Sequence, residues 1–165
     1  MKAKKGFTRQ MLTKEFFREM LLEQFPGESD SFKVVEFQET NIDASSGNST
    51  DMSQGSEKLF GHFPFDIKWT TAKTHGTTRL VLKSKVHGHE LLSNMRGHYQ
   101  KGSERLAQTY DLATPIVHAK THIREPLIYQ EIQDARFQKL TPKIFKTWCD
   151  EENEIYLIAM ERFEL

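Results

Sequence analysis

The chain has 165 residues, and its 23 lysine and arginine residues balance its 23 aspartate and glutamate residues, so the formal net charge is zero. This length is enough for one domain with a hydrophobic core and short for two. The charge balance argues against a nucleic-acid-binding domain, which is usually visibly basic.

No apolar run approaches the roughly 20 residues of a membrane-spanning helix, and the lysines near the N-terminus are not followed by the apolar segment of a signal peptide. The single cysteine, Cys149, cannot form an intramolecular disulfide, which suits a reducing compartment, so we expect a soluble, cytoplasmic domain.

The first predicted element is a helix over residues 8–25. Thr8 is a suitable N-cap, and Phe7 before it can pack on Leu12 as a hydrophobic staple. A Pro-Gly pair follows the helix and ends it. Its apolar face is formed by Leu12, Phe16, Met20 and Leu21.

Three strands are predicted next, over residues 32–42, 60–71 and 78–86. In the second of them, aromatic and aliphatic residues alternate with polar ones, which is typical of a strand with one buried face. The segment 43–58, between the first two strands, is rich in Ser, Gly, Asn, Thr and Asp and predicts a long loop. Turn-forming residues 73–77 join the last two strands. A strand, a polar loop and a hairpin predict a three-stranded antiparallel meander.

Two helices are predicted after the meander. Residues 88–112 have a moderately amphipathic helical pattern, which Gly97 and Gly102 weaken. A second helix covers residues 122–137. Pro126 must then lie in its first turn or mark a kink, because proline lacks the backbone donor that a helix interior needs.

The last predicted elements are two strands, over residues 143–149 and 154–162, joined by the acidic turn 150–153. The order along the chain is therefore one helix, three strands, helices and two strands. We expect an α+β domain with a five-stranded antiparallel sheet and flanking helices.

Three segments carry a resemblance to a known family. Residues 80–83, Leu-Val-Leu-Lys, end an apolar run with a lysine; residues 124–129, Arg-Glu-Pro-Leu-Ile-Tyr, open a helix; and residues 156–163, Tyr-Leu-Ile-Ala-Met-Glu-Arg-Phe, form the last strand and its exit. In this order they resemble the N-terminal lobe of the kinase-like phosphotransferases, most closely the small-molecule branch of aminoglycoside, choline and ecdysteroid-type kinases. The resemblance covers residues 32–165, which would form the kinase-like lobe, and leaves residues 1–31 as an N-terminal helix extension.

The resemblance implies that the domain binds ATP. Lys83 would contact the α- and β-phosphates, and Glu125 would hold its ammonium group in place and keep it charged. At the hinge, the carbonyl of Glu161 and the N–H of Phe163 would bond the edge of the adenine. Backbone N–H groups of the polar loop would fold over the phosphates. The loop residues concerned are Ser46, Gly47, Asn48 and Ser49.

The resemblance also implies which parts of the enzyme this chain lacks. The catalytic-loop aspartate and the aspartate that binds Mg²⁺ in such enzymes would lie C-terminal to Leu165. The implied function is thus the ATP-binding lobe of a phosphotransferase acting on a small-molecule hydroxyl, inactive by itself. Its implied partners are the nucleotide, with Mg²⁺ held mainly by residues outside this chain, and a C-terminal lobe or a dimer partner that covers the face of the cleft.

The residues taken alone leave alternatives open. Lys85 points to the same face as Lys83, because side chains in a strand alternate with a period of two, so it is a rival for the phosphate role. A lysine at a strand end also protects an edge strand, and a glutamate in the first turn of a helix is favoured by the helix dipole alone. The alternative function is a stand-alone α+β binding or interaction domain with no catalytic role, and a third is a small-ligand pocket between the sheet and the helix 88–112.

The histidines and the cysteine point less strongly to other chemistry. His118 and His122 are four residues apart, a spacing that can bind zinc on a helix, and His87 and His89 follow the strand lysine. No third ligand accompanies them at a typical spacing, so we expect solvated histidines. For Cys149, at the end of a strand, we expect a packed and unreactive thiol.

Overall fold

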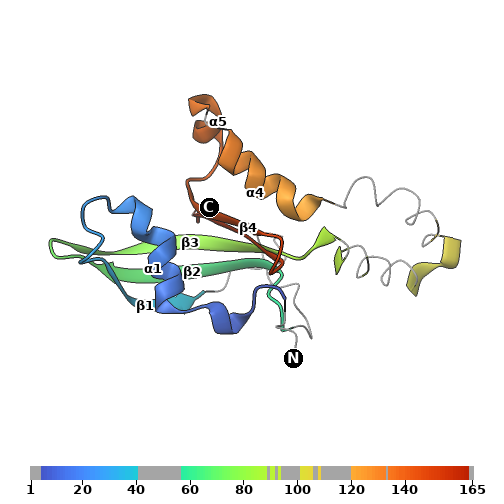
Figure 1. Ribbon diagram of the computed structural model, residues 1–165, viewed down its shortest axis with the longest axis horizontal. Coiled ribbons are helices and arrows are strands. Elements are labelled where there is room, and N and C mark those ends of the chain that lie inside the picture. The colour runs from blue at the N-terminus through green and yellow to red at the C-terminus, as the bar shows by residue number, and fades with distance from the viewer. Residues whose placement is uncertain are drawn as a thin grey trace.

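Five antiparallel strands form one open sheet at the centre of the structure (Figure 1). The structure is a computed structural model, and its α+β fold with a five-stranded antiparallel sheet is the one the sequence predicts. None of the described helices is long and apolar enough to cross a membrane. The structure describes residues 5–40, 57–88, 90, 91, 93, 101–105, 108, 120–132 and 134–163.

The order of the strands in the sheet is β1-β2-β3-β5-β4. The meander of β1, β2 and β3 is confirmed, and β3 lies between β2 and β5. The last strand therefore returns beside the strand that carries Lys83, and Lys83 pairs with Ile158 across β3 and β5. The strands are β1 (Lys33–Glu39), β2 (Gly61–Thr70), β3 (His75–Lys85), β4 (Ile144–Asp150) and β5 (Ile155–Glu161).

The hairpin between β2 and β3 turns earlier than predicted. Thr70 pairs with His75, so β3 begins three residues before the predicted start of that strand. The turn is held by Thr71, whose hydroxyl oxygen accepts hydrogen bonds from the N–H groups of Lys73 and Thr74 at 3.2 and 3.1 Å. These bonds between the Thr71 side chain and the backbone stabilise a turn that comes earlier in the chain than the predicted turn at residues 73–77.

The prediction of one helix over residues 8–25 is wrong at its start, and the segment forms three short helices. Thr8 is extended and makes no side-chain cap, since it forms a β-bridge with Lys58, while Phe7 accepts a backbone bond from Leu59 at 2.8 Å. The true cap is Thr13, whose hydroxyl oxygen accepts from the N–H of Phe16 at 3.1 Å. The parts are η1 (Arg9–Met11), α1 (Lys14–Leu21) and η2 (Leu22–Gln24), where η denotes a 3₁₀ helix.

The helix predicted over residues 122–137 is also two helices, α4 (Thr121–Glu131) and α5 (Ala135–Leu140). The chain becomes extended at Ile132, and the side chain of Asp134 caps α5 by accepting from the N–H of Arg136 at 2.7 Å. Pro126 is the sixth residue of α4 and so does not lie in its first turn. Most of the helix predicted over residues 88–112 lies outside the described residues.

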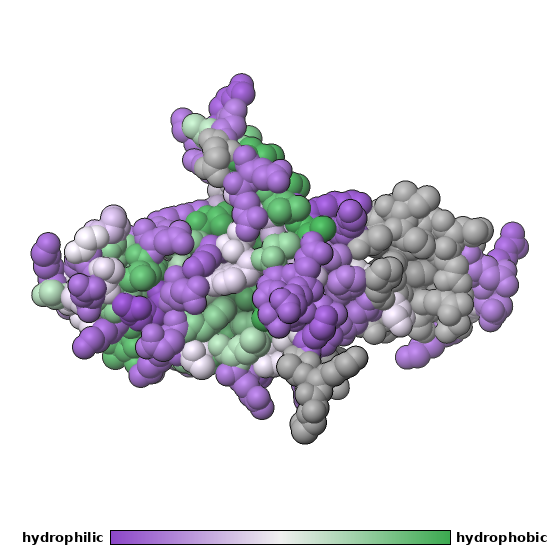
Figure 2. All heavy atoms as spheres, viewed as in Figure 1, coloured by the Kyte–Doolittle hydropathy of each residue, from purple (hydrophilic) through white to green (hydrophobic). Residues whose placement is uncertain are grey.

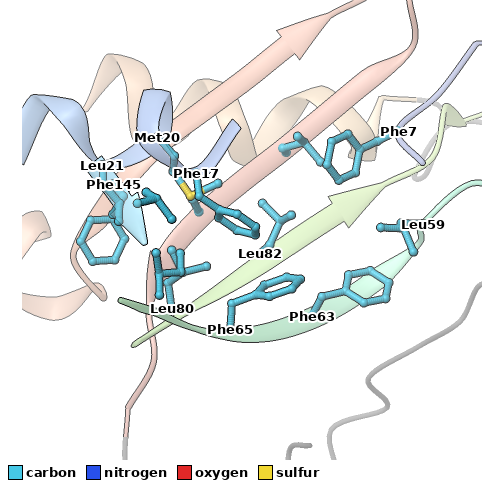
Figure 3. Packing of buried hydrophobic residues seen from close by; sticks show 14 of the residues in the cluster. Phe7, Phe17, Met20, Leu21, Leu59, Phe63, Phe65, Leu80, Leu82 and Phe145 are labelled. Atoms are coloured by element: carbon cyan, nitrogen blue, oxygen red, sulfur yellow. The ribbon is translucent and has the colours of Figure 1, made fainter. Parts of the chain in front are cut away.

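The hydrophobic core lies between the sheet and α1 (Figure 3). Phe17 of α1 is completely buried, and its ring lies 4.7 Å from that of Phe37 in β1 and 4.9 Å from that of Phe65 in β2. Leu80 and Leu82 of β3 reach the same core. Since side chains alternate along a strand, Val81, Lys83 and Lys85 point to the opposite face of the sheet.

Candidate functional site

The face of the sheet opposite the core carries a cluster of two lysines and one glutamate. Lys83 Nζ lies 2.8 Å from Oε1 and 2.7 Å from Oε2 of Glu125. Lys85 Nζ lies 2.7 Å from Oε2 of the same carboxylate and donates a hydrogen bond to the backbone carbonyl of Thr121 at 3.0 Å. The predicted pairing of Lys83 with Glu125 is therefore present in the structure, and the rival Lys85 joins it. The nucleotide-binding role of these residues stays a prediction.

Two local features of the sequence place the cluster. The alternation of β3 turns Lys83 and Lys85 to one face. Glu125 is the fifth residue of α4, and α4 packs against β4 and β5. The first turn of α4 is tied to the end of β3, because Nδ1 of His122 accepts a hydrogen bond from the N–H of Gly88 at 3.0 Å.

The electrostatics of the cluster favour an anion. Burial by itself would raise the pKa of the Glu125 carboxyl, but hydrogen bonds and charge from Lys83 and Lys85 outweigh it, and the pKa is lowered from its usual value. Burial lowers the pKa of Lys85, and Glu125 offsets only part of this effect. Two ammonium groups and one carboxylate leave a formal charge of +1 on a half-buried surface.

The residues of the predicted hinge lie at the end of β5. Glu161 pairs with Leu80 of β3, and its N–H donates to the carbonyl of Lys143 at 2.8 Å. Phe163 is 63 % exposed. Along β3, Leu80 and Lys83 are three residues apart, or about 10 Å at about 3.3 Å per residue. The structure thus brings the predicted hinge and the predicted phosphate contact to neighbouring strands.

Sequence reasoning missed Arg162, which joins the end of β5 to the first two strands. Its guanidinium lies 2.8 Å from Oδ1 of Asp66 in β2 and donates to the hydroxyl of Thr40 at 2.6 Å. Thr40 directly follows β1 and in turn donates its N–H to the carbonyl of Pro64 at 2.9 Å. Asp66 could have indicated this contact from the sequence, because a charged side chain within an aromatic strand needs a partner of opposite charge when it is partly buried.

The remaining predicted site residues do not join this cluster in the described part of the chain. The four loop residues proposed to cover the phosphates lie outside the described residues, as do His118 and His89. The expectation of a solvated histidine is wrong for His122, which is buried and lies against the rings of His87 and Tyr156, each at 4.5 Å between centroids. Within the described residues, no three His, Cys, Asp or Glu side chains form a group that could hold a metal ion.

A groove of about 770 Å³ lies between the α4–α5 pair and β4, and reaches Glu161. Tyr129, Phe137 and Lys146 are among its lining residues, and Lys83 and Glu125 are not. Ile132, which also lines the groove, is exposed, as are Ile128 and Leu140, and Figure 2 shows apolar surface along the projecting α4–α5 pair. This groove is separate from the charged cluster.

Cys149 is expected to react slowly. Burial raises the pKa of its thiol, and the nearby charges of Glu151 and Asp150 raise it further, so little thiolate forms near neutral pH. We expect an aromatic disulfide reagent to modify Cys149 in the folded chain at roughly one tenth of its rate in denaturant. Equal rates in the two conditions, followed by absorbance of the released thiol, would contradict this prediction.

Comparison of the chain with protein-family models, with curated proteins and with solved structures found no match.

Proposed function

We propose that this domain is the ATP-binding lobe of a phosphotransferase that acts on a small-molecule hydroxyl. The observation that supports the proposal best is the contact of Lys83, on the third strand of the sheet, with Glu125, on a helix that follows it. In protein kinases, a lysine of the third strand and a glutamate of the following helix form the pair that orients the phosphates of ATP. The resemblance that the sequence suggests is thus supported by a contact between residues 42 positions apart.

Other residues of the sheet support the proposal. Val81 and Met160 are paired across β3 and β5 and point to the same face as Lys83. They lie between the hinge residue Glu161 and Lys83, so an adenine held at the hinge would rest on apolar side chains. The phosphates would then extend along β3 toward the ammonium groups, and the excess positive charge of the cluster fits an anion there.

The described residues fit ATP better than they fit Mg²⁺. The one carboxylate of the cluster already neutralises two ammonium groups, so it is a poor ligand for a divalent cation. We propose that Mg²⁺ and the base that accepts the hydroxyl proton are supplied by residues outside this chain, in a C-terminal lobe or a dimer partner. Within this chain, Lys83 would hold the phosphates and Glu125 would orient Lys83.

Replacing Lys83 with methionine tests the proposal. Methionine keeps most of the side-chain volume and removes the charge, while Lys85 still pairs with Glu125, so the fold should be retained. We expect the chain to bind ATP, and the affinity of the Lys83→Met variant to be about tenfold lower, or about 1.4 kcal/mol. Isothermal titration with MgATP measures both dissociation constants.

Lys68→Met is the matched control, because Lys68 is an exposed strand lysine that also pairs with a glutamate, Glu36, at 2.8 Å. Its affinity for ATP should equal that of the parent. The proposal fails if the parent chain does not bind ATP, or if Lys83→Met binds it as tightly as Lys68→Met does.

One observation favours the second candidate, a stand-alone interaction domain with no catalytic role. The α4–α5 pair exposes Ile128, Ile132 and Leu140 beside the groove on β4, and exposed apolar surface next to a groove is typical of a binding face. This function needs no nucleotide. Absence of ATP binding by the parent chain would therefore favour it.

A further inference from the structure

We propose that Lys85 is a positioning residue, which fixes Glu125 and α4 against the sheet. Lys83 is then the lysine that contacts the phosphate. This inference rests on the proposed function for the role of Lys83. The role of Lys85 in holding α4 can be tested without any nucleotide.

The contacts of the two lysines differ in kind. Lys83 reaches both oxygens of the Glu125 carboxylate, at 2.8 and 2.7 Å. Lys85 reaches one of these oxygens at 2.7 Å and also donates to the backbone carbonyl of Thr121 at 3.0 Å. Of the two, only Lys85 donates to the backbone of α4 in the described part of the chain. Lys85 therefore holds the helix at two points, one on its backbone and one on a side chain a turn further on.

The positions of the two lysines support the same division. The Lys85 side chain is 16 % exposed and that of Lys83 is 24 % exposed. Lys85 also lies two residues further from the hinge end of the sheet, or about 7 Å along β3, beside the first turn of α4. The lowered pKa of Lys85, caused mainly by burial, agrees with an ammonium group that faces the protein. A ligand that extends from the hinge would meet Lys83 first.

The helix α4 needs such polar anchors because it buries little apolar surface. Of its residues, all of them described, only His122 and Pro126 are buried. Lys83 also bonds Glu125, and polar contacts lie near both ends of the helix: Gly88 donates to His122 at 3.0 Å, and Gln130 donates to Thr147 of β4 at 2.8 Å. Removing Lys85 takes away the bond to the Thr121 carbonyl and one of the contacts of Glu125, while Lys83 still holds that carboxylate. The first turn of α4 should therefore loosen, and Glu125 should be held less firmly.

Hydrogen–deuterium exchange of the α4 amides, without nucleotide, compares Lys85→Met with Lys83→Met. We expect Lys85→Met to speed exchange over α4 by roughly tenfold, because the bonds to the Thr121 carbonyl and to Glu125 are lost together, and Lys83→Met to change it less than threefold. Lys68→Met should leave it unchanged. Equal exchange in the two cluster variants, or faster exchange in Lys83→Met, would overturn the proposal.

Titration with MgATP then separates this inference from the proposed function. Lys85→Arg should restore slow exchange, since a guanidinium can bond the carboxylate and the carbonyl together, whereas Lys83→Arg should not recover the ATP affinity that Lys83→Met loses. If the parent does not bind ATP, the proposed function fails and the exchange data still decide the role of Lys85. If Lys85→Arg fails to slow exchange relative to Lys85→Met, Lys85 does not position α4.

Discussion

Replacing Phe17 with alanine is expected to lower the free energy of unfolding by about 3–5 kcal/mol, the usual loss for a buried phenylalanine. Phe17 is completely buried, and its ring contacts those of Phe16, Phe37 and Phe65 at 4.7 to 5.4 Å between centroids. The variant would leave a cavity lined by aromatic rings that cannot collapse, because they come from α1 and two different strands. Urea denaturation followed by circular dichroism measures the change.

Phe163→Ala is the matched control, since the Phe163 side chain is 63 % exposed. It should change the free energy of unfolding by less than about 0.5 kcal/mol. Similar losses in the two variants would mean that the contacts between α1 and the sheet do not hold the core together.

The strands could be predicted from the sequence because their pattern is local. Phe63, Phe65 and Ile67 alternate with other residues along β2, and all three are buried in the core. The start of the first helix could not be predicted, because Thr8 is held in an extended conformation by Lys58, far along the chain. At this position a tertiary contact outweighs the helix propensity of the local sequence, as commonly happens at the ends of helices.

Within the candidate site, the pairing of Lys83 with Glu125 could be predicted only from the family resemblance, because the spacing of the residues does not indicate it. Nothing local to Lys83 indicates that Glu125 would lie beside it, and the resemblance suggested that pairing. The contact of Lys85 with the backbone of Thr121 has no sequence signal, because any residue offers a carbonyl. The contact of Arg162 with Thr40, 122 residues away, likewise depends on the order of the strands in the sheet.

Replacing Glu125 with glutamine is expected to lower the free energy of unfolding by about 2–3 kcal/mol near neutral pH. Removing one partner of a buried ion pair costs about 3–5 kcal/mol, and the value is reduced here because the Glu125 side chain is 28 % exposed. The substitution keeps the shape of the side chain but leaves two ammonium groups close together with no carboxylate between them. Urea denaturation of the parent and the variant measures the difference.

The pH dependence of this difference identifies its cause. The pKa of Glu125 is lower in the folded chain than the ordinary value of 4.5, so its stabilising contribution is complete above that value. As the pH falls below it, the unfolded chain takes up the proton first, and the contribution is lost as the pH passes through the folded pKa. The gap in the free energy of unfolding between the parent and Glu125→Gln should therefore be widest near neutral pH and should narrow as the pH falls below 4.5. The matched Glu36→Gln variant, at an exposed carboxylate paired with Lys68, should show no measurable gap at neutral pH. A gap for Glu125→Gln that stays constant on acidification would mean that packing around the side chain, and not the charge shared with Lys83 and Lys85, is what the substitution removes.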